Sequence, residues 1–352
     1  MRLSVQQDVD LRALNTFGFA ARAERFVRAQ SLDMLQQAVV LARTEGWPLL
    51  LLGGGSNLVL RERIPGLVVQ VALKGRAVRV EGDSVLATVA AGESWHDTVA
   101  WSLQQGYFGL ENLALIPGTV GAAPMQNIGA YGVELEERFH ELRALDIETG
   151  EICRFSRADC AFGYRDSLFK SRQPGRYVIL DVTFALSCRP EPVLRYRALA
   201  EELQRRGIEQ PTPQDVFDAV CSVRRSKLPD PALIGNAGSF FKNPVVTAAQ
   251  YRSLRTAFPD LVAFEAGQDY KLAAGWLIDR CGWKGHRQGA VGVYPHQALV
   301  LVNEGEGCAS ELLRLADAIT DSVRERFGVE LEMEPRVYPA RQGRIIKRLF
   351  AD

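Results

Sequence analysis

A hydroxyl, two aromatic rings and a lysine lie side by side in residues 235–244, which read GNAGSFFKNP. The glycines and asparagines leave the backbone free to hold the hydroxyl of Ser239 at a fixed point. Two aromatic rings can exclude water from a site, and Lys242 can hold an anion there. A surface turn that precedes a strand accounts for the same residue types. Ser239 is therefore a candidate functional hydroxyl whose partners lie elsewhere in the chain.

A first glycine loop, Gly53-Gly54-Gly55-Ser56-Asn57, follows the apolar run of residues 48–52. It does not match the Rossmann dinucleotide fingerprint, because Leu58 occupies the third required glycine position and the following residues are typical of a strand. A P-loop is excluded because the chain contains no Gly-Lys-Ser/Thr sequence. The free backbone N–H groups of such a turn can bind an anion, and a plain tight turn is the alternative.

A second glycine loop spans residues 116–132, IPGTVGAAPMQNIGAYG. Its four glycines allow the backbone to approach a flat or phosphorylated ligand, and Gln126 and Asn127 offer amides to heteroatoms. Long irregular loops inside compact domains are usually functional or disordered, and this one is too apolar for disorder. The sequence therefore predicts a binding loop here.

The composition limits the class of protein. With 352 residues, 47% of them hydrophobic, the chain fits two or three folded domains. Its 42 basic and 42 acidic residues balance, so no overall field attracts nucleic acid or an anionic membrane. The six cysteines and four histidines lack metal-ligand spacing, and scattered thiols indicate a reducing compartment. We expect no metal, no signal peptide and no membrane span, and therefore a cytoplasmic protein.

Periodicity and capping residues predict an α+β fold, with more strands in the first part and more helices in the second. Helices are expected from Ser31, from Ser94, from Thr212, around residues 271–281 and over 310–327. Strands are expected at residues 48–52, 77–80, 85–89, 144–148, 151–155, 177–186 and 298–302. Prolines between residues 190 and 213 indicate a domain boundary.

The two glycine loops, with Asn15-Thr16-Phe17-Gly18 ahead of them, resemble the FAD-binding domain of UDP-N-acetylenolpyruvoylglucosamine reductases. The similarity continues in order through nearly the whole chain, in the segments FGYRDS (162–167), PVLRY (192–196), RSKLPDP (225–231), GNAGSFFKNP (235–244) and LAAGWLID (272–279). Tyr196 lies where the type I branch of that family carries a tyrosine. The resemblance implies a two-part FAD-binding domain of the vanillyl-alcohol-oxidase/PCMH type and a separate α+β substrate-binding domain. The implied division is residues 1–70 joined by 330–352, then 71–210, then 211–329.

The resemblance also implies a reaction. NADPH reduces a non-covalently bound FAD, and the hydride of flavin N5 passes to the enolpyruvyl methylene carbon of a UDP-sugar. The product is UDP-N-acetylmuramate, a precursor of peptidoglycan. The implied partners are the small-molecule UDP-sugar and NADPH, with no nucleic acid and no membrane, and a monomer is expected.

Residue roles follow from the same resemblance, position by position. Ser239 matches the proton donor, Arg165 the arginine that polarises the substrate carboxylate, and Glu334 the C-terminal catalytic acid. The positions that match substrate contacts are Tyr196, Lys227, Asn243 and Gln297. Those that match flavin contacts are Gly53, Gly54, Gly55, Ser56, Asn57, Pro117, Gly118, Thr119, Gly121, Ala122, Gln126, Asn127, Gly129, Ala130, Tyr131 and Gly132.

Physical chemistry supports these roles and leaves two choices open. Hydride addition moves negative charge onto the conjugated carboxylate, and the planar guanidinium of Arg165 can bind both oxygens of that carboxylate. A surface ion pair between Arg165 and Asp166 is the alternative. Glu332 and Glu334 both fit the C-terminal acid, because alternate residues of a strand share a face. Either Lys227 or Lys242 could stabilise the alkoxide of Ser239.

Two other functions compete. One is an FAD-dependent sugar or alcohol oxidase with the same cofactor domain; none of the four histidines lies in a glycine loop, which argues against a histidine-tethered flavin without excluding an oxidase. The other is a non-catalytic UDP-sugar sensor that has kept the fold.

Overall fold

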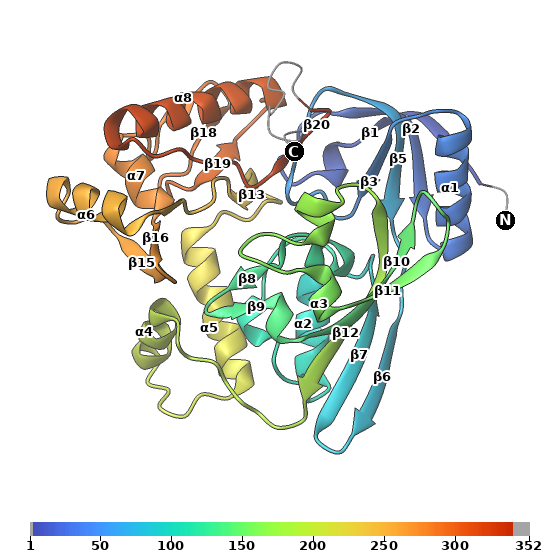
Figure 1. The fold of residues 1–352 in the computed structure, drawn as a ribbon, viewed down its shortest axis with the longest axis horizontal. Coiled ribbons are helices and arrows are strands. Elements are labelled where there is room, and N and C mark those ends of the chain that lie inside the picture. The colour runs from blue at the N-terminus through green and yellow to red at the C-terminus, as the bar shows by residue number, and fades with distance from the viewer. Residues whose placement is uncertain (1–2, 341–352) are drawn as a thin grey trace. The chain divides into compact units, whose positions relative to one another are not determined.

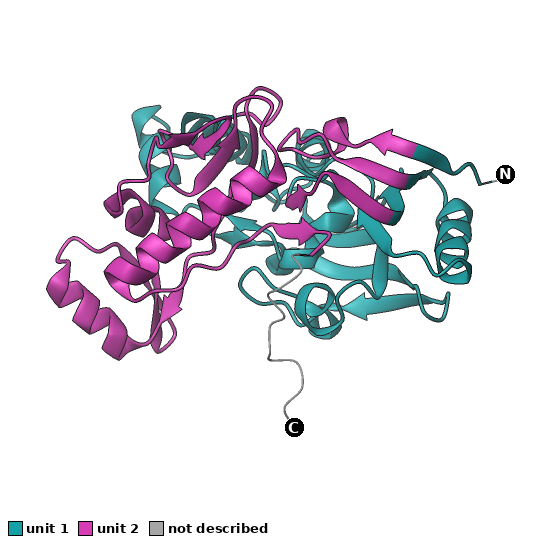
Figure 2. Ribbon diagram, turned by 90° about the horizontal axis from the view of Figure 1, so that it is seen from above, with its two compact units in different colours: residues 1–7, 25–56, 66–229 teal, residues 8–24, 57–65, 230–352 magenta. Residues whose placement is uncertain are grey.

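The computed structural model describes residues 3–340, which form two compact units (Figure 2). Of these residues, the first unit contains 3–7, 25–56 and 66–229, and the second contains 8–24, 57–65 and 230–340. Three of the five boundaries between the units fall inside strands, namely β1 (Gln6–Asp10), β2 (Arg22–Ala29) and β5 (Arg63–Val71). No helix in residues 3–340 has the length and apolar character needed to cross a membrane.

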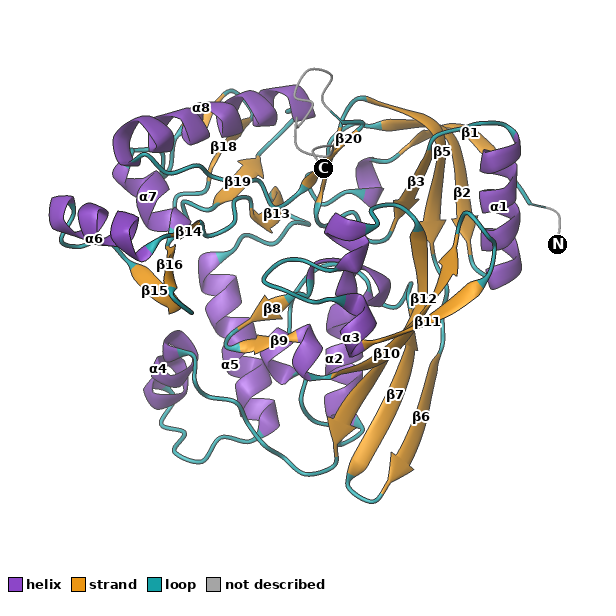
Figure 3. Ribbon diagram, viewed as in Figure 1, coloured by secondary structure: helices purple, strands orange, loops and turns teal. Residues whose placement is uncertain are grey.

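The first unit combines helices with an antiparallel sheet, as is typical of an α+β fold (Figure 3). Its helices are α1 (Leu32–Thr44), α2 (Trp95–Gln104), α3 (Arg157–Cys160), α4 (Arg197–Arg205) and α5 (Pro213–Lys227). Its complete strands are β3 (Leu49–Leu52), β6 (Arg76–Glu81), β7 (Ser84–Ala90), β8 (Gly129–Ala130), β9 (Val133–Glu134), β10 (Phe139–Asp146), β11 (Ile152–Ser156) and β12 (Tyr177–Ser187). A short π-helical segment covers Leu168–Arg172.

Local capping explains where the principal helices begin. The hydroxyl of Ser31 accepts from the backbone N–H of Met34 at the start of α1. Thr212 and Asp215 form a capping box at the start of α5, in which the side chain of each accepts from the backbone N–H of the other. Both helices start within a residue of the position that the sequence predicted.

An antiparallel sheet with the order β11-β10-β12-β7-β6 supports most of the first unit. Its central strand β12 lies between β10 and β7 (Figure 1) and is buried on both faces. Val178 and Leu180 pack into the cluster that includes α1, whereas Val182 and Phe184 pack into the cluster that includes α2. The predicted strands at residues 77–80 and 85–89 are confirmed as β6 and β7, which pair antiparallel.

The second unit contains several small sheets and one large core. Its strands are β4 (Leu58–Leu60), β13 (Gly235–Ser239), β14 (Val245–Val246), β15 (Ala263–Ala266), β16 (Asp269–Leu272), β17 (Arg287–Gln288), β18 (Val291–Val293), β19 (Val300–Asn303) and β20 (Arg336–Tyr338). Its helices are α6 (Ala248–Ala257), α7 (Ala274–Arg280) and α8 (Ala309–Phe327). Helix α8 lies across β18 and β19 in Figure 1 and buries Leu312, Ile319 and Val323 against them. Gly328 ends this helix in the left-handed conformation.

Two differences from the sequence predictions concern boundaries. Helix α7 begins only at Ala274, because Lys271 belongs to β16 and pairs with β14 and β15. The boundary between the compact units lies after Pro229, whereas the proline pattern placed a domain change between residues 190 and 213. Helices α4 and α5 bury Leu199, Leu203 and Val220 in the core of the first unit, and they are therefore counted with it.

Candidate active site

The two glycine loops pack directly against each other in the first unit. A Cβ atom added to Gly53 would lie 2.6 Å from Oγ1 of Thr119, and one added to Gly118 would lie 2.6 Å from Oγ of Ser56. The Ser56 hydroxyl donates to the carbonyl of Pro117 over 3.1 Å. Side chains are therefore excluded where the loops meet, which accounts for the glycines there.

Unused backbone donors remain in this pair of loops. Among residues 3–340, the backbone N–H groups of Gly54, Gly55 and Thr119 donate to no protein acceptor. Gly55 is in the left-handed region, with a φ of 62°. Successive free N–H groups in such a turn form a concave site for an anion. The loops thus have the donors that a phosphorylated ligand requires.

Two residues around the start of α2, Ala91 and His96, hold the second loop in place through hydrogen bonds. The backbone N–H of Gly121 donates to Ala91 over 2.9 Å, and a Cβ on Gly121 would lie 2.5 Å from the Cβ of Ala91. Nδ1 of His96 accepts from the backbone N–H of Leu115 over 3.0 Å, and its ring stacks on Phe217. Burial lowers the pKa of His96, which favours the neutral ring that this acceptor role needs. His96 is thus a structural residue of the loop.

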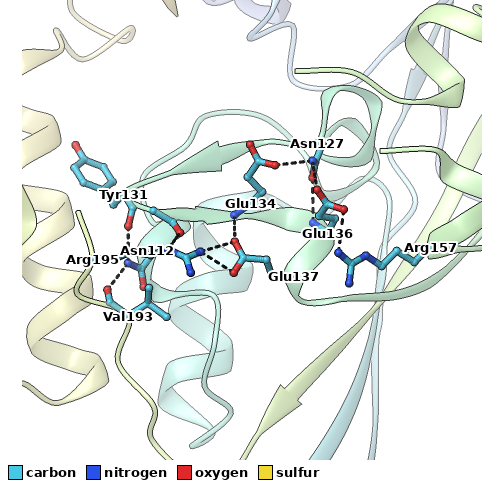
Figure 4. Close-up of polar contacts among 10 residues, drawn as sticks. Asn112, Asn127, Tyr131, Glu134, Glu136, Glu137, Arg157, Val193 and Arg195 are labelled. Carbon is cyan, nitrogen blue, oxygen red and sulfur yellow. Dashed lines mark hydrogen bonds and ion pairs between the residues drawn. The ribbon is translucent and has the colours of Figure 1, made fainter. Parts of the chain in front are cut away.

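Asn127 and Gln126, predicted to bind the cofactor, use their amides inside the protein. The side chain of Asn127 is fully buried, donates to Glu134 and accepts from the backbone N–H of Glu136 (Figure 4). Oε1 of Gln126 accepts from Nζ of Lys170 over 3.1 Å. These contacts hold the loop in shape. Asn127 has a φ of 43°, which asparagine tolerates better than most residues.

Arg165 lies against the second glycine loop. Its Nη2 donates to the carbonyl of Gly129 over 2.8 Å, and a Cβ on Gly129 would lie 3.2 Å from its Nη1. The backbone of Arg165 has a φ of 55°, a strained value for a residue with a side chain. Backbone strain of this kind concentrates at functional sites. Asp166 accepts a hydrogen bond from the hydroxyl of Ser171.

A second arginine, Arg224, was not assigned a role from the sequence. It lies near the C-terminal end of α5, close to Arg165 and to the ring of Tyr131. Burial lowers the pKa of Arg224 and raises that of Tyr131 to about 12. The Nε of Arg224 is buried and, within residues 3–340, has no hydrogen-bond partner. This N–H is therefore a donor that remains available to a ligand atom.

The position of Arg224 on the apolar face of α5 could have identified it from the sequence as a candidate functional residue. Phe217, Cys221 and Arg224 follow one another at helical spacing on the side that packs into the core. A cation in such a stripe is exceptional, whereas Lys227, at the end of α5, is exposed. Helical spacing therefore distinguishes Arg224 from its solvated neighbours.

Tyr196, the other predicted substrate residue of the first unit, immediately precedes α4. Its side chain is 45% exposed, and its ring meets that of Tyr131 edge to face with centroids 5.2 Å apart. The structure therefore places a predicted substrate residue beside a predicted flavin residue.

In the second unit, a bulge presents Ser239 to solvent. Strand β13 pairs with β19, but its register shifts between Asn236 and Ser239. Gly238 has a φ of 68°, and the side chain of Asn236 accepts from its backbone N–H over 2.9 Å. Ser239 is exposed whereas Phe240 is buried. The glycine and the asparagine thus fix the direction of the hydroxyl, as the residue types indicated.

The residues that follow Ser239 serve the core. Phe240 and Phe241 are each 1% exposed and pack with Phe17 in the core of the second unit. Nζ of Lys242 forms an ion pair with Oε1 of Glu332 at 2.5 Å. The sequence predicted a water-excluding lining and an anion-binding lysine. In the structure, the rings of Phe240 and Phe241 instead pack in the core, and Lys242 pairs with the carboxylate of Glu332.

Glu334 lies beside the Ser239 segment. Its backbone N–H donates to the carbonyl of Phe240 over 2.8 Å, and Met333 forms a β-bridge with Phe241. The chain bends at Glu334, so residues 332–334 are not the regular strand that the sequence predicted. Glu332 and Glu334 consequently have different surroundings, and the side chain of Glu332 is the one that pairs with Lys242.

Asn243 and Gln297 each lie near the start of α7. Oδ1 of Asn243 accepts from the backbone N–H of Ala274 over 2.9 Å. Oε1 of Gln297 accepts from the backbone N–H of Leu299 over 3.3 Å and would lie 3.0 Å from a Cβ on Gly275. Their amide oxygens are thus oriented by the protein. Arg165, Tyr196 and Lys227 belong to the first unit, and Ser239, Asn243, Gln297 and Glu334 to the second.

Comparisons with known proteins give a consistent result. Residues 230–338 match the family model of the UDP-N-acetylenolpyruvoylglucosamine reductase C-terminal domain, and residues 23–156 match an FAD binding domain. UDP-N-acetylenolpyruvoylglucosamine reductases from Pseudomonas putida and Pseudomonas aeruginosa are each 52% identical over 96% of the chain and 100% of their own length. The Paraburkholderia phytofirmans enzyme of the same name is 54% identical over 92% of the chain and 95% of its own length. The crystal structure of the Thermus caldophilus reductase matches with a TM-score of 0.66 at 25% identity, over 96% of this chain and 100% of that one.

Proposed function

The chain belongs to the UDP-N-acetylenolpyruvoylglucosamine reductase family, and we infer from this membership that it reduces the enolpyruvyl group of UDP-N-acetylenolpyruvoylglucosamine to give UDP-N-acetylmuramate. It is an FAD-dependent oxidoreductase of peptidoglycan precursor synthesis, with NADPH as the reductant. One observation carries this conclusion: relatives that bear the reductase name match nearly the whole chain, including the segment in which Glu334 lies beside Phe240.

The glycine loops fit an FAD. Free N–H groups of Gly54, Gly55 and Thr119 suit its diphosphate, and the unpaired Nε of Arg224 suits an oxygen of the ligand. When bound, FAD supplies hydride transfer from NADPH to the substrate. We assign flavin binding to the predicted positions of both loops, with Asn127 and Gln126 supporting the loop through internal hydrogen bonds.

The developing negative charge determines the role of Arg165. Reduction adds a hydride to the methylene carbon, and the electron pair moves toward the conjugated carboxylate. A guanidinium stabilises that charge and can bind both carboxylate oxygens. The hydrogen bond to Gly129 and the positive φ of Arg165 hold this side chain against the flavin loop. We assign substrate contacts to Tyr196, Lys227, Asn243 and Gln297 on the basis of the family motif.

Ser239 completes the reduction by donating a proton to the neighbouring carbon. The exposed hydroxyl at the end of β13 is available for this transfer. Because the ammonium of Lys242 is paired with Glu332, we favour Lys227 as the cation that stabilises the Ser239 alkoxide. The same ion pair favours Glu334 over Glu332 as the catalytic acid, because it engages the carboxylate of Glu332. The backbone of Glu334 pairs with Phe240, the residue next to Ser239.

Anaerobic single-turnover spectroscopy tests the function. NADPH should bleach the bound flavin, and the enolpyruvyl UDP-sugar should restore its colour, with UDP-N-acetylmuramate identified by mass spectrometry. Restored colour only with oxygen, and turnover of a sugar or alcohol, would establish the oxidase alternative. A flavin that NADPH does not bleach would instead favour a UDP-sugar sensor. Yellow colour that stays in an acid-precipitated pellet would exclude the non-covalent FAD.

Close packing of the second loop predicts the effect of Gly121→Ala. The added methyl would overlap Ala91, so the variant should lose about 1–3 kcal/mol of unfolding free energy, together with much of its flavin. Urea unfolding and the flavin-to-protein absorbance ratio measure the two effects. Gly163→Ala is the matched control, because its Cβ would lie 4.0 Å from the nearest atom. Equal losses in the two variants would contradict this explanation, as would a failure of Ala91→Gly to restore part of the flavin to Gly121→Ala.

Domain division, compartment and oligomeric state complete the proposal. Strand β20 pairs in parallel with β4, which supports the proposal that the C-terminal segment 330–352 joins residues 1–70. Residues 1–2 and 341–352 of this proposed subdomain lie outside the described part of the chain. We keep the division into residues 71–210 and 211–329 as a proposal. The six cysteines, all within residues 3–340, are free thiols, as a cytoplasmic location requires. A monomer is proposed, and sedimentation equilibrium would test it.

A further inference from the structure

The segment that carries Tyr196 has no regular structure of its own. Residues 188–195 connect the end of β12 with α4 and belong to no helix or strand. At its C-terminal side, the carbonyl of Tyr196 accepts from Leu199 and Ala200 in the first turn of α4. The N-terminal side of Tyr196 therefore depends on contacts with other parts of the first unit.

A single buried amide connects this segment to the second glycine loop. The side chain of Asn112 is 2% exposed, and its Nδ2 donates to the carbonyl of Tyr131 over 3.0 Å and to that of Val193 over 2.9 Å (Figure 4). Both hydrogens of this amide are thus used to join two backbones. The amide links the backbone of Tyr131 directly to a residue three positions before Tyr196.

The residue next to Tyr196 makes a second connection to the same loop. Nε of Arg195 donates to the carbonyl of Gly132 over 2.5 Å, and Nη2 contacts both carboxylate oxygens of Glu137 at 2.9 and 2.8 Å (Figure 4). The aliphatic part of Arg195 covers Gly132, where an added Cβ would lie 2.9 Å from its Cγ. Two observations thus explain the glycine at position 132: a side chain there would overlap Arg195, and the φ of 85° favours glycine.

These two connections lie on the N-terminal side of Tyr196. Asn112 and Arg195 hold the backbone on one side of Tyr196, and α4 holds it on the other. The ring is thereby kept edge to face with Tyr131, although almost half of it is exposed. Without these connections, a half-exposed tyrosine on an irregular segment would lose its fixed position.

We propose that Asn112 and Arg195 are positioning residues, which fix Tyr196 on the flavin loop and so pre-form the part of the substrate site that Tyr196 supplies. This inference rests on the proposed function, in which Tyr196 contacts the UDP-sugar. Arg195 and Asn112 act on substrate binding through the tyrosine.

Equilibrium binding of UDP-N-acetylmuramate to the oxidised enzyme, measured by calorimetry, tests the proposal. Arg195→Gln should weaken binding about tenfold, which corresponds to about 1.4 kcal/mol. The rate of flavin bleaching by NADPH and the flavin content should stay within about twofold of the wild type. Arg197→Gln is the matched control: it removes a neighbouring arginine whose partner is Glu201 on the same exposed helix face, and it should bind normally.

A double substitution separates positioning from other roles. In a Tyr196→Ala background, Arg195→Gln should change the dissociation constant by less than about twofold, because an effect transmitted through Tyr196 is already lost. Glu137→Gln should reproduce part of the Arg195→Gln effect, since it removes the charge and still accepts from Glu134.

Three results would overturn the inference: normal binding by Arg195→Gln, an additive loss in the Tyr196→Ala background, or a loss of flavin and thermal stability equal to the loss of binding. A failure of the proposed function looks different, because the wild type itself would then neither bind UDP-N-acetylmuramate nor reduce the enolpyruvyl substrate.

Discussion

Ser239→Ala should leave reduction of the flavin by NADPH nearly intact and slow its reoxidation by the enolpyruvyl substrate about 10²- to 10⁴-fold, the usual contribution of a positioned proton donor. The hydroxyl projects from the bulge at the end of β13, and the methyl of alanine keeps the bulge while it removes the proton. Stopped-flow absorbance under anaerobic conditions resolves the two half-reactions. Product release does not complicate this reading, because each half-reaction is followed in a single turnover.

Two further variants make the Ser239 experiment decisive. Ser239→Cys, which retains a transferable proton, should recover part of the rate. Ser310→Ala removes another hydroxyl of the second unit, one that donates to Glu62, and should react like the wild type. If Ser239→Ala slowed both half-reactions equally, a role in flavin binding would replace the role in proton transfer.

Glu334→Gln should slow the oxidative half-reaction by a similar factor, about 10²-fold or more, whereas Glu332→Gln should stay within about threefold of the wild type. Glutamine keeps the size and hydrogen-bonding groups of the acid but cannot exchange a proton. The hydrogen bond from the backbone N–H of Glu334 to Phe240 sets this residue beside the Ser239 segment. Glu332 is 71% exposed and bound to Lys242, so it serves as a matched control of identical chemistry.

The opposite pattern, with Glu332→Gln inactive and Glu334→Gln active, would mean that the C-terminal motif is misaligned and that the Lys242–Glu332 pair is part of the catalytic apparatus. Lys242→Met adds an independent check. It should leave the oxidative half-reaction within about threefold of the wild type if Lys227 is the cation that assists Ser239.

Some of the site could be predicted because the controlling interactions are local. The glycines of residues 53–55 and of the 116–132 loop predict backbone conformations and close approaches that only glycine permits. The structure shows such close approaches at Gly53, Gly118 and Gly121. The bulge that presents Ser239 depends on Gly238 and Asn236, which are neighbours in the chain. Capping residues likewise mark the starts of α1 and α5.

Other parts of the site could not be predicted because they depend on partners distant in the chain. Glu332 and Glu334 have the same residue type and nearly the same position, and only the bend and the pairing with residues 240–242 give them different surroundings. The same holds for Lys242, whose partner is ninety positions away. No local pattern distinguishes a lysine bound to a carboxylate from one that holds a ligand.

By itself, the sequence determined the fold class, the two glycine loops and the glycine-rich segment that carries Ser239, because backbone sterics and helix caps act over a few residues. The tertiary structure decided which groups are already engaged: Phe240 by the core, Lys242 by Glu332, and Asn112 by two backbone carbonyls. The reason is that burial and hydrogen-bond satisfaction are properties of the folded neighbourhood. A polar group is available to a ligand only if no other part of the folded chain already forms hydrogen bonds or ion pairs with it.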